Sequence, residues 1–497
     1  MFPSVVCSAS RRSFTRTGPV SHPQDFSAAV CDRYPEGMRL ALAACAALIT
    51  ACSGGDLQEP SAEDSGVDDV ATPDAAAEVA ADAADGAAID AKSDGDGEGE
   101  TGVKCPSPPI ADSLADERAA CKFGKGAKVA TTLGITAAVR AKIPLTHLVV
   151  VMNENRSFDH LFGTLETEGQ PEAEGIPATF SNKDAAGKVV KPFHLGSTCL
   201  ERDPPHGWDP MHAKWNAGKM DGFVTASDIS GSNGHYAMGY YRKADLPFYN
   251  FLANTWAISD RYFASVIGPT WPNRDYLYAG TSDGVTNTFE RNIDVPTVFD
   301  ALDAAKVGWG IYGDGGSRAG CAGVTRNHYK MADFLAQVAS GKLPPVVFLD
   351  PTGAQDEHPP NDVQGGEAWS RKIYEAARKS PLWPEMAVLF TYDEGGGLFD
   401  HVPPPKACLA SPSQAKFDRL GFRVPLTVVS PYARPHFVSH KTHEHSSILR
   451  LIELLHDLPA LTARDANSDA LLDLFDFACP TMLDAPAGPA AGVAGCP

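Results

Sequence analysis

After residue 104, segments with the apolar pattern of buried strands alternate with segments with the apolar spacing of helices. Short apolar runs predict strands over residues 147–152, 308–313, 345–350, 386–394 and 424–430. Segments with helical spacing lie between them, among them residues 298–306, 366–380 and 446–457. This alternation predicts an α/β fold with a mostly parallel central sheet covered by helices.

Two of these predicted strands end in polar side chains. The run "HLVVVM" is followed by Asn153, Glu154 and Asn155, and the run "MAVLFTY" is followed by Asp393, Glu394 and three glycines. Ligands of parallel sheets bind beyond the carboxyl ends of the strands, so we expect these side chains at one rim. Their oxygens suit a divalent cation. Polar loops with helix caps are the alternative.

A hydroxyl stands near the predicted start of another helix. In "GPTWPNRDYLYAG", Pro272 fits the first turn of a helix and Thr270 would stand just before it. A helix N-terminus offers unpaired backbone donors and positive dipole, which favour an alkoxide and bind a phosphoryl oxygen. Thr270 is therefore a candidate nucleophile, with simple helix capping as the alternative.

Histidines gather in loops rich in Pro, Gly or acidic residues, where binding residues are common. Six of the chain's 15 histidines do so: His206, His212, His358, His401, His443 and His445. Any one of them could be a structural hydrogen-bonding group. Beside a metal ion and a hydroxyl, the set supplies oxyanion contacts, a general acid and a general base, as phosphoryl transfer requires.

The N-terminal part predicts export. Residues 38–52 have a short basic start and an apolar core too short to span a membrane as a mature helix, which is typical of a signal peptide. The sequence "ITAC" resembles a bacterial lipobox and predicts lipidation of Cys52; an ordinary secretory signal is the alternative. We expect a lipid-anchored protein of the bacterial cell envelope, at the outer membrane or cell surface, or else a secreted one. Residues 1–37 would be an upstream artefact of gene calling or an extended leader.

The segment of residues 53–103 predicts a disordered acidic tether, because it has too few apolar residues to offset the entropy of ordering. Up to Lys104 it carries 15 acidic residues against two lysines, which is −13 of the chain's net charge of −20. No basic run appears elsewhere, so nucleic acid is an unexpected partner. Residues 104–497 are expected to form a single domain.

Seven cysteines follow the tether: Cys105, Cys121, Cys199, Cys321, Cys408, Cys479 and Cys496. In an exported domain they permit three disulfides and one free thiol. Short spacings favour the pairs Cys105–Cys121 and Cys479–Cys496, although spacing does not settle the connectivity. No C-x-x-C pair suggests a structural zinc site.

Six motifs taken together resemble one known family. They are "NENRSFDHLFG", "HGWDPMHAKWNAGKMDGF", "GPTWPNRDYLYAGTS", "EHPP", "TYDEGGGLFDHVPPP" and "EHSSILRLIE", in an order and spacing that cover residues 145–455. The chain thereby resembles the bacterial phosphoesterase family of non-haemolytic phospholipases C and a respiratory-burst-inhibiting acid phosphatase. The resemblance implies an alkaline-phosphatase-like three-layer sandwich, with one divalent metal ion at the strand ends.

The resemblance also implies roles for individual residues. The metal ligands would be Glu154, Asn155, Thr270, Asp393 and Glu394. The catalytic groups would be Thr270 as nucleophile and the histidines His206, His212, His358, His401 and His445. Substrate contacts would come from Asn155, Arg274 and Trp208.

Four details bear on the substrate that the resemblance implies. Thr270 to Arg274 have the x-Pro-x-Arg frame of sulfatases, but a threonine, as a secondary alcohol, cannot be oxidised to their catalytic aldehyde, so a phosphoester is expected. Glu444-His445 stands where relatives often have Asp-His. The chain also ends soon after Cys479, without the added domains of long phospholipases C. A choline cage of aromatic residues, or simple packing, is expected of Trp208, Trp215, Trp271, Tyr240 and Tyr241.

The sequence therefore predicts metal-assisted phosphoryl transfer from a phosphate ester to Thr270 and then to water. A phospholipase C acting on phospholipids is the first expectation. An acid phosphatase acting on phosphomonoesters is the alternative within enzymes. A surface lipoprotein that binds phosphorylated ligands without turnover is the alternative from another class.

Overall fold

The computed structural model describes residues 105–107, 110–229, 231–315, 317–493 and 495. The predicted signal peptide, the lipidation site Cys52 and the predicted tether lie outside these residues and stay predictions. Within the described part of the chain, no helix is long and apolar enough to cross a membrane.

An eight-stranded sheet forms the centre of the described structure. Its strand order is β13 (Phe437–Ser439), β6 (Ala257–Ser259), β12 (Leu426–Val429), β11 (Met386–Tyr392), β1 (His147–Asn153), β10 (Val346–Leu349), β8 (Trp309–Tyr312) and β9 (His328–Tyr329). Neighbouring strands run parallel except where β12 pairs antiparallel with β11 and β6. The five predicted strands are β1, β8, β10, β11 and β12, so the prediction of a mostly parallel sheet is confirmed.

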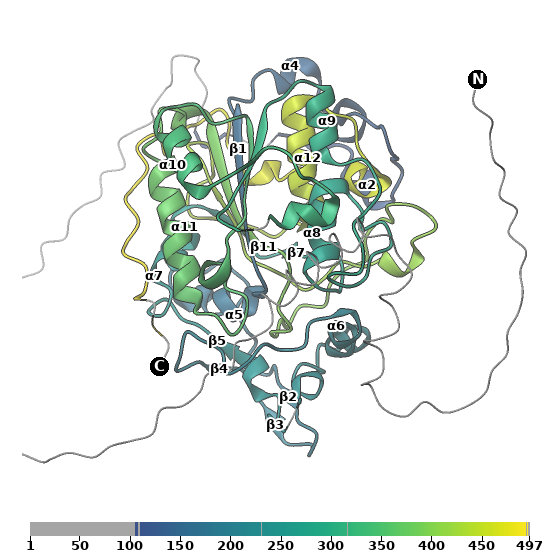
Figure 1. The fold of residues 1–497 in the computed structure, drawn as a ribbon, viewed down its shortest axis with the longest axis vertical. Helices are drawn as coiled ribbons and strands as arrows, with labels where there is room; N and C mark the ends of the chain where they lie inside the picture. The colour runs from purple at the N-terminus through teal and green to yellow at the C-terminus, as the bar shows by residue number, and fades with distance from the viewer. Residues whose placement is uncertain (1–104, 108–109, 230, 316, 494, 496–497) are drawn as a thin grey trace, which may run out of the picture. The chain divides into compact units, whose positions relative to one another are not determined.

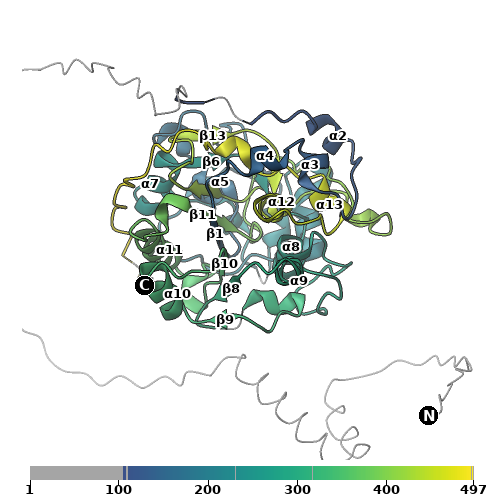
Figure 2. The ribbon, with the colours of Figure 1, turned by 90° about the horizontal axis from the view of Figure 1, so that it is seen from above.

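Helices cover both faces of this sheet and make three layers. Figure 2 shows α7 (Pro247–Thr255), α10 (Met331–Ala339) and α11 (Val363–Ala377) on one face, and α8 (Thr270–Ala279), α9 (Val298–Ala304) and α12 (His445–His456) on the other. The three predicted helices are α9, α11 and α12. The central strands β1 and β11 are buried along nearly their whole length, which explains their continuous apolar runs.

The register of the two central strands places their polar ends side by side. Asn153, the last residue of β1, pairs with Tyr392, the last residue of β11. Just beyond the strands, the Asn155 backbone N–H donates to Asp393 Oδ1 at 3.0 Å. The predicted rim at the carboxyl ends of the strands is therefore formed.

A smaller substructure follows α5 (Phe158–Phe162) near the carboxyl end of β1 (Figure 1). It contains β2 (Asn182–Lys183), β3 (Val189–Val190), β4 (Phe193–His194), α6 (Trp208–Trp215) and β5 (Gly239–Tyr240). An apolar cluster that includes Met211, Phe223 and Met238 packs it against Phe399 and Phe422. This substructure carries His206, Trp208 and His212 to the rim side of the molecule.

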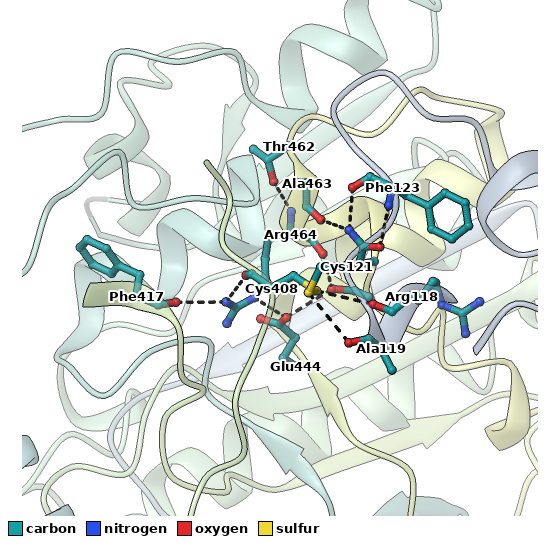
Figure 3. The surroundings of a disulfide bond; sticks show 12 residues. Arg118, Ala119, Cys121, Phe123, Cys408, Phe417, Glu444, Thr462, Ala463 and Arg464 are labelled. Atoms are coloured by element: carbon teal, nitrogen blue, oxygen red, sulfur yellow. Dashed lines mark hydrogen bonds and ion pairs between the residues drawn. A yellow bond between two sulfur atoms is a disulfide. The ribbon is translucent and has the colours of Figure 1, made fainter. Parts of the chain in front are cut away.

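The disulfide pairs favoured by short spacing are wrong. The structure pairs Cys105 with Cys479 and Cys121 with Cys408, and Cys199 is also disulfide-bonded. Figure 3 shows Cys121, which follows α2 (Ala115–Ala119), bonded to Cys408 beside Arg464 and Glu444. The chain before β1 packs against the segment after α12, because the Gly126 N–H donates to Ala460 O at 2.7 Å. Tertiary packing, and not sequence spacing, decides these pairs.

Candidate active site

The backbone after β1 makes a tight turn against the loop after β11. Asn155 has a φ of 65°, a left-handed conformation that asparagine tolerates better than most residues. Gly396 in the facing loop has a φ of 61°, and a Cβ there would lie 2.1 Å from the Asn155 carbonyl oxygen. The glycines after Glu394 therefore let the two loops close on each other.

The side-chain amide of Asn155 lies between two carboxylates and two imidazoles. One end of the amide is 3.2 Å from Asp393 Oδ1 and 2.9 Å from Glu394 Oε1. The other end is 3.1 Å from His206 Nε2 and 3.0 Å from His358 Nε2. With its nitrogen toward the carboxylates, the amide satisfies all four neighbours, and this orientation follows from the hydrogen-bond network.

The reverse orientation of this amide suits a cation. It would place the Asn155 oxygen among the oxygens of Asp393 and Glu394, a group of acceptors that needs a positive charge at its centre. Thr270 Oγ1 lies 3.4 Å from the same end of the amide. Asn155, Thr270, Asp393 and Glu394 thus fit a divalent cation chemically.

Glu154, the fifth predicted ligand, is directed elsewhere. Its Oε1 accepts from Arg318 Nε at 2.5 Å and lies 3.6 Å from Arg274 Nη2. Arg318 begins a 3-10 helix, Arg318–Ala322. Glu154 borders the cluster, but its carboxylate forms ion pairs with Arg274 and Arg318.

Thr270 is the first residue of α8, and the N-cap position before it is Pro269. The prediction that Thr270 stands before the helix is therefore off by one residue. No side chain caps this helix. The Thr270 hydroxyl faces the Asn155 amide instead, and the residue is 6% exposed. The capping alternative does not describe this threonine.

Arg274 lies beneath the site, one turn further along α8. Its Nε donates to Asp393 Oδ2 and its Nη1 to Asp350 Oδ1, both at 3.0 Å, and Nη2 donates to Met152 O at 3.1 Å. Burial alone would lower the pKa of this guanidinium, but the carboxylates of Asp393, Asp350 and Glu154 raise it well above its usual value. This fully buried arginine fixes carboxylates and does not face a substrate.

His206 and His358 both present Nε2 to the site. Nδ1 of His206 lies 2.8 Å from Pro204 O, and Nδ1 of His358 lies 2.7 Å from Pro359 O, which holds both rings in place. Burial would lower the pKa of His206, but the charges of Glu394 and Asp203 raise it to about 9. Burial in turn raises the pKa of Glu394. His206 and Glu394 together therefore hold a proton at neutral pH.

The other predicted histidines have different surroundings. His445 is fully buried behind Asp393, with Nε2 2.7 Å from Asp393 O and Nδ1 2.9 Å from Tyr262 Oη, and burial lowers its pKa to about 4. His401 contacts Asp159 at 2.7 Å in a cluster organised by Arg423. His212 contacts Trp208 O at 2.8 Å, beside a cavity of about 50 Å³. The structure brings His206 and His358 to Asn155, and the other three histidines contact other groups.

Comparison with known proteins supports the resemblance. A family model described as "Phosphoesterase family" matches residues 145–459. The chain belongs to this family. Non-specific phospholipase C6 of Arabidopsis thaliana is 30% identical over 386 residues, which cover 69% of this chain and 74% of that protein. Phospholipase C B of Mycobacterium tuberculosis is 32% identical over 412 residues, covering 68% and 78%.

Solved structures similar to this phosphoesterase include a protein of the alkaline phosphatase superfamily from Vibrio parahaemolyticus. Its TM-score is 0.36 at 10% identity, with 66% of this chain and 69% of that chain covered. The lipoteichoic acid synthase LtaP of Listeria monocytogenes has a TM-score of 0.35 at 8% identity, with 72% and 82% covered. Family membership makes the protein a hydrolase of phosphate esters.

Two polar residues of this phosphoesterase site, Asp203 and Lys214, were not predicted from the sequence. Asp203 lies 3.3 Å from His206 Nδ1, and the two form, with His358, a group whose ligand atoms lie within 4.8 Å of one another. Lys214 of α6 is fully buried and donates to Pro205 O at 2.7 Å and to Gly397 O at 2.9 Å. It ties the loop of His206 to the loop of Glu394. The Asp203–His206 spacing of three residues was the one available hint.

The predicted aromatic cage is not assembled in this phosphoesterase. Trp208 stacks on His212 with ring centroids 4.6 Å apart, and Lys416 Nζ lies 5.5 Å over the Trp208 ring. The other aromatic residues have other partners. Trp215 lies under Arg419, and Trp271 contacts Phe289. Tyr240 contacts His194, and Tyr241 contacts His160. Trp208 and Trp215 lie on either side of His212 and line the same small cavity, whereas Trp271, Tyr240 and Tyr241 are not among the residues that line it.

Proposed function

We propose that this phosphoesterase is a metal-dependent phospholipase C that cleaves a phospholipid through the Thr270 hydroxyl. One observation carries the proposal. The Thr270 hydroxyl lies at the start of α8, 3.4 Å from the amide that contacts Asp393, Glu394, His206 and His358. A nucleophile, oxygen ligands and two imidazoles therefore meet at one side chain.

The chain's own residues supply two of the requirements for attack on phosphorus. Thr270 opens a ten-residue helix, whose unpaired N–H groups and dipole stabilise negative charge on oxygen. Asn155, Asp393, Glu394 and Thr270 would hold the divalent cation, and Glu154 would support them from the edge. When bound, such a cation acts as a Lewis acid toward the hydroxyl and a phosphoryl oxygen.

Proton transfer falls to the two histidines. Thr270 Oγ1 forms a bond to phosphorus and passes its proton through a bridging water to His358 Nε2, at the other end of the Asn155 amide, while the bond from phosphorus to the alcohol oxygen breaks. His206, whose pKa is about 9, gives its proton to that oxygen. Water then forms a bond to the phosphorus of the phosphothreonine and gives a proton to His206, while the bond from phosphorus to Thr270 Oγ1 breaks. The phosphate product leaves, and His358 returns its proton to Thr270.

The other predicted residues have supporting roles in this proposal. Arg274 fixes Asp393, and His445 holds the backbone of Asp393 from behind. The phospholipase C assignment is supported by the names of the relatives, which are phospholipases C at 30 to 32% identity. Export and lipid anchoring at Cys52 belong to the same proposal and would bring the enzyme to a membrane.

The test compares the full chain with its Thr270→Ala variant on phosphatidylcholine vesicles and on an aryl phosphate, with divalent metal added. Phosphocholine release that depends on Thr270 would support a phospholipase C. Inorganic phosphate from the aryl ester alone would favour the acid phosphatase alternative. Release of neither product, with phosphatidylcholine still bound, would favour the non-catalytic lipoprotein.

A further inference from the structure

A pair of aromatic rings, the exposed Phe289 and the partly buried Trp271, lies beside the nucleophile end of α8. Trp271 follows Thr270 directly, and its ring packs edge-on against Phe289 with centroids 4.9 Å apart. Phe289 is 79% exposed, although a phenylalanine is normally buried.

The backbone of Phe289 is strained as well as exposed. Its φ is 62°, in the left-handed region that a bulky side chain avoids. Such conformations persist where the surrounding structure enforces them, and they are common at functional sites. Burial of the ring does not explain this strain.

Polar contacts on both sides of Phe289 enforce its position. The Glu290 carboxylate accepts from the backbone N–H groups of Thr286 and Asn287, at 2.9 and 3.1 Å. Arg291 Nη1 donates to Asp283 Oδ2 at 2.9 Å. The loop therefore holds the ring outward and does not leave it free to collapse onto the protein.

The same loop reaches the substructure that carries the histidines. Asn287 Oδ1 accepts from the Trp208 backbone N–H at 3.5 Å, and the exposed cation Lys416 lies over the Trp208 ring. An apolar ring and a cation thus share one rim with Thr270. This combination is complementary to a phospholipid surface, which offers anionic phosphates above apolar chains.

We propose that Phe289, backed by Trp271, is the contact through which this protein enters a phospholipid surface. Insertion of the ring below the phosphates would hold a neighbouring phosphate at the depth of Thr270. Aromatic side chains favour this boundary between head groups and acyl chains. The inference rests on the proposed function, because it describes how the enzyme reaches a phospholipid substrate that lies in a lipid surface.

A fluorescence experiment tests the contact without relying on turnover. The Phe289→Trp variant of the full chain is mixed with phosphatidylcholine vesicles that contain brominated acyl chains. Its added tryptophan emission should be quenched relative to vesicles without bromine. The control is Leu483→Trp, at a 51% exposed position in the C-terminal segment. That segment packs against α11, on the other face of the sheet from α8, since Tyr374 Oη donates to Pro486 O. Equal quenching in the two variants, or none in either, would overturn the proposal.

Turnover provides a second test. Phe289→Asn removes the ring but keeps a residue that accepts the left-handed backbone. The ratio of phosphatidylcholine cleavage in vesicles to cleavage of a monomeric short-chain phosphatidylcholine should fall about tenfold, as expected for losing one buried aromatic contact. Leu483→Ala should leave this ratio unchanged. An unchanged ratio in Phe289→Asn would refute the lipid contact. Inactivity of the parent on both lipids would refute the proposed function instead, and the quenching result would still stand.

Discussion

The Thr270 hydroxyl lies 3.4 Å from the side-chain amide of Asn155 and does not cap the helix that it begins. Thr297, at the start of α9, shows the ordinary arrangement, because its side chain accepts from the Asp300 N–H in a capping box. Two threonines at helix starts therefore have different tasks. One satisfies the backbone of its helix, and the other leaves its hydroxyl facing the candidate site.

This contrast predicts opposite effects of the same substitution. Thr270→Ala should lower phosphoesterase turnover by at least about a thousandfold, because the attacking oxygen is lost. Its free energy of unfolding should stay within about 0.5 kcal/mol of the parent. Thr297→Ala should cost about 1 kcal/mol of stability through the lost cap and leave turnover unchanged. Urea unfolding and steady-state kinetics measure both quantities.

Thr270→Ser refines the same prediction. A serine keeps the oxygen and should retain measurable turnover, well above that of Thr270→Ala. Near-normal turnover in Thr270→Ala would remove Thr270 from the mechanism, whatever the serine variant does.

Asn155→Gly tests the amide at the centre of the cluster. Glycine accepts the left-handed backbone, so the fold should be kept while the link between carboxylates and imidazoles is lost. Turnover should fall at least about a hundredfold, and the variant should lose divalent metal on dialysis, as measured by elemental analysis. Asn216→Gly is the matched control, because Asn216 has a φ of 41° at the end of α6. Full metal retention in Asn155→Gly would show that the amide is not a ligand.

Removal of metal should affect stability as well as turnover. Asp393 and Glu394 are fully buried, and a bound cation would offset the repulsion between their charges. A strong chelator should therefore abolish turnover and lower the unfolding temperature, and added divalent cation should restore both. Calorimetry before and after dialysis measures the shift. Undiminished turnover in protein shown to contain no metal would exclude the predicted cofactor.

Sequence patterns predicted the centre of the site because strand ends are a local signal. Buried runs that stop at Glu154-Asn155 and Asp393-Glu394 are visible in the sequence, and the parallel sheet brings them together. Arg318 could not be predicted in this way. It reaches Glu154 from 164 residues further along the chain, at the start of a 3-10 helix with no motif. Contacts of this kind depend on tertiary packing.

The direction of side chains could not be predicted from the sequence either. His401 and His445 lie in recognisable motifs, but spacing does not say where a ring points. His445 faces the backbone of Asp393, and His401 faces Asp159. The same limit explains the wrong disulfide pairs, since Cys121 meets Cys408 across 287 residues.

His443 gives a pH-dependent prediction away from the candidate site. It is fully buried, with Nδ1 3.4 Å from Asp469 Oδ1 and Nε2 3.4 Å from Asp473 Oδ1. Burial alone would lower its pKa, but the hydrogen bond to Asp473 and the two carboxylate charges outweigh burial and raise it. The same contact helps to lower the pKa of Asp473 to about 2, against the opposing effect of burial.

Because its pKa is raised on folding, His443 binds a proton more tightly in the folded state than in the unfolded state. Its stabilisation is complete below the unfolded pKa of about 6.5 and is lost as pH rises through the folded pKa. His443→Gln should therefore lower the free energy of unfolding more at pH 5.5 than at pH 9, as measured by urea unfolding. In an Asp473→Asn background this pH dependence should become much weaker. An equal loss at both pH values would show that the contribution of His443 is packing and not charge.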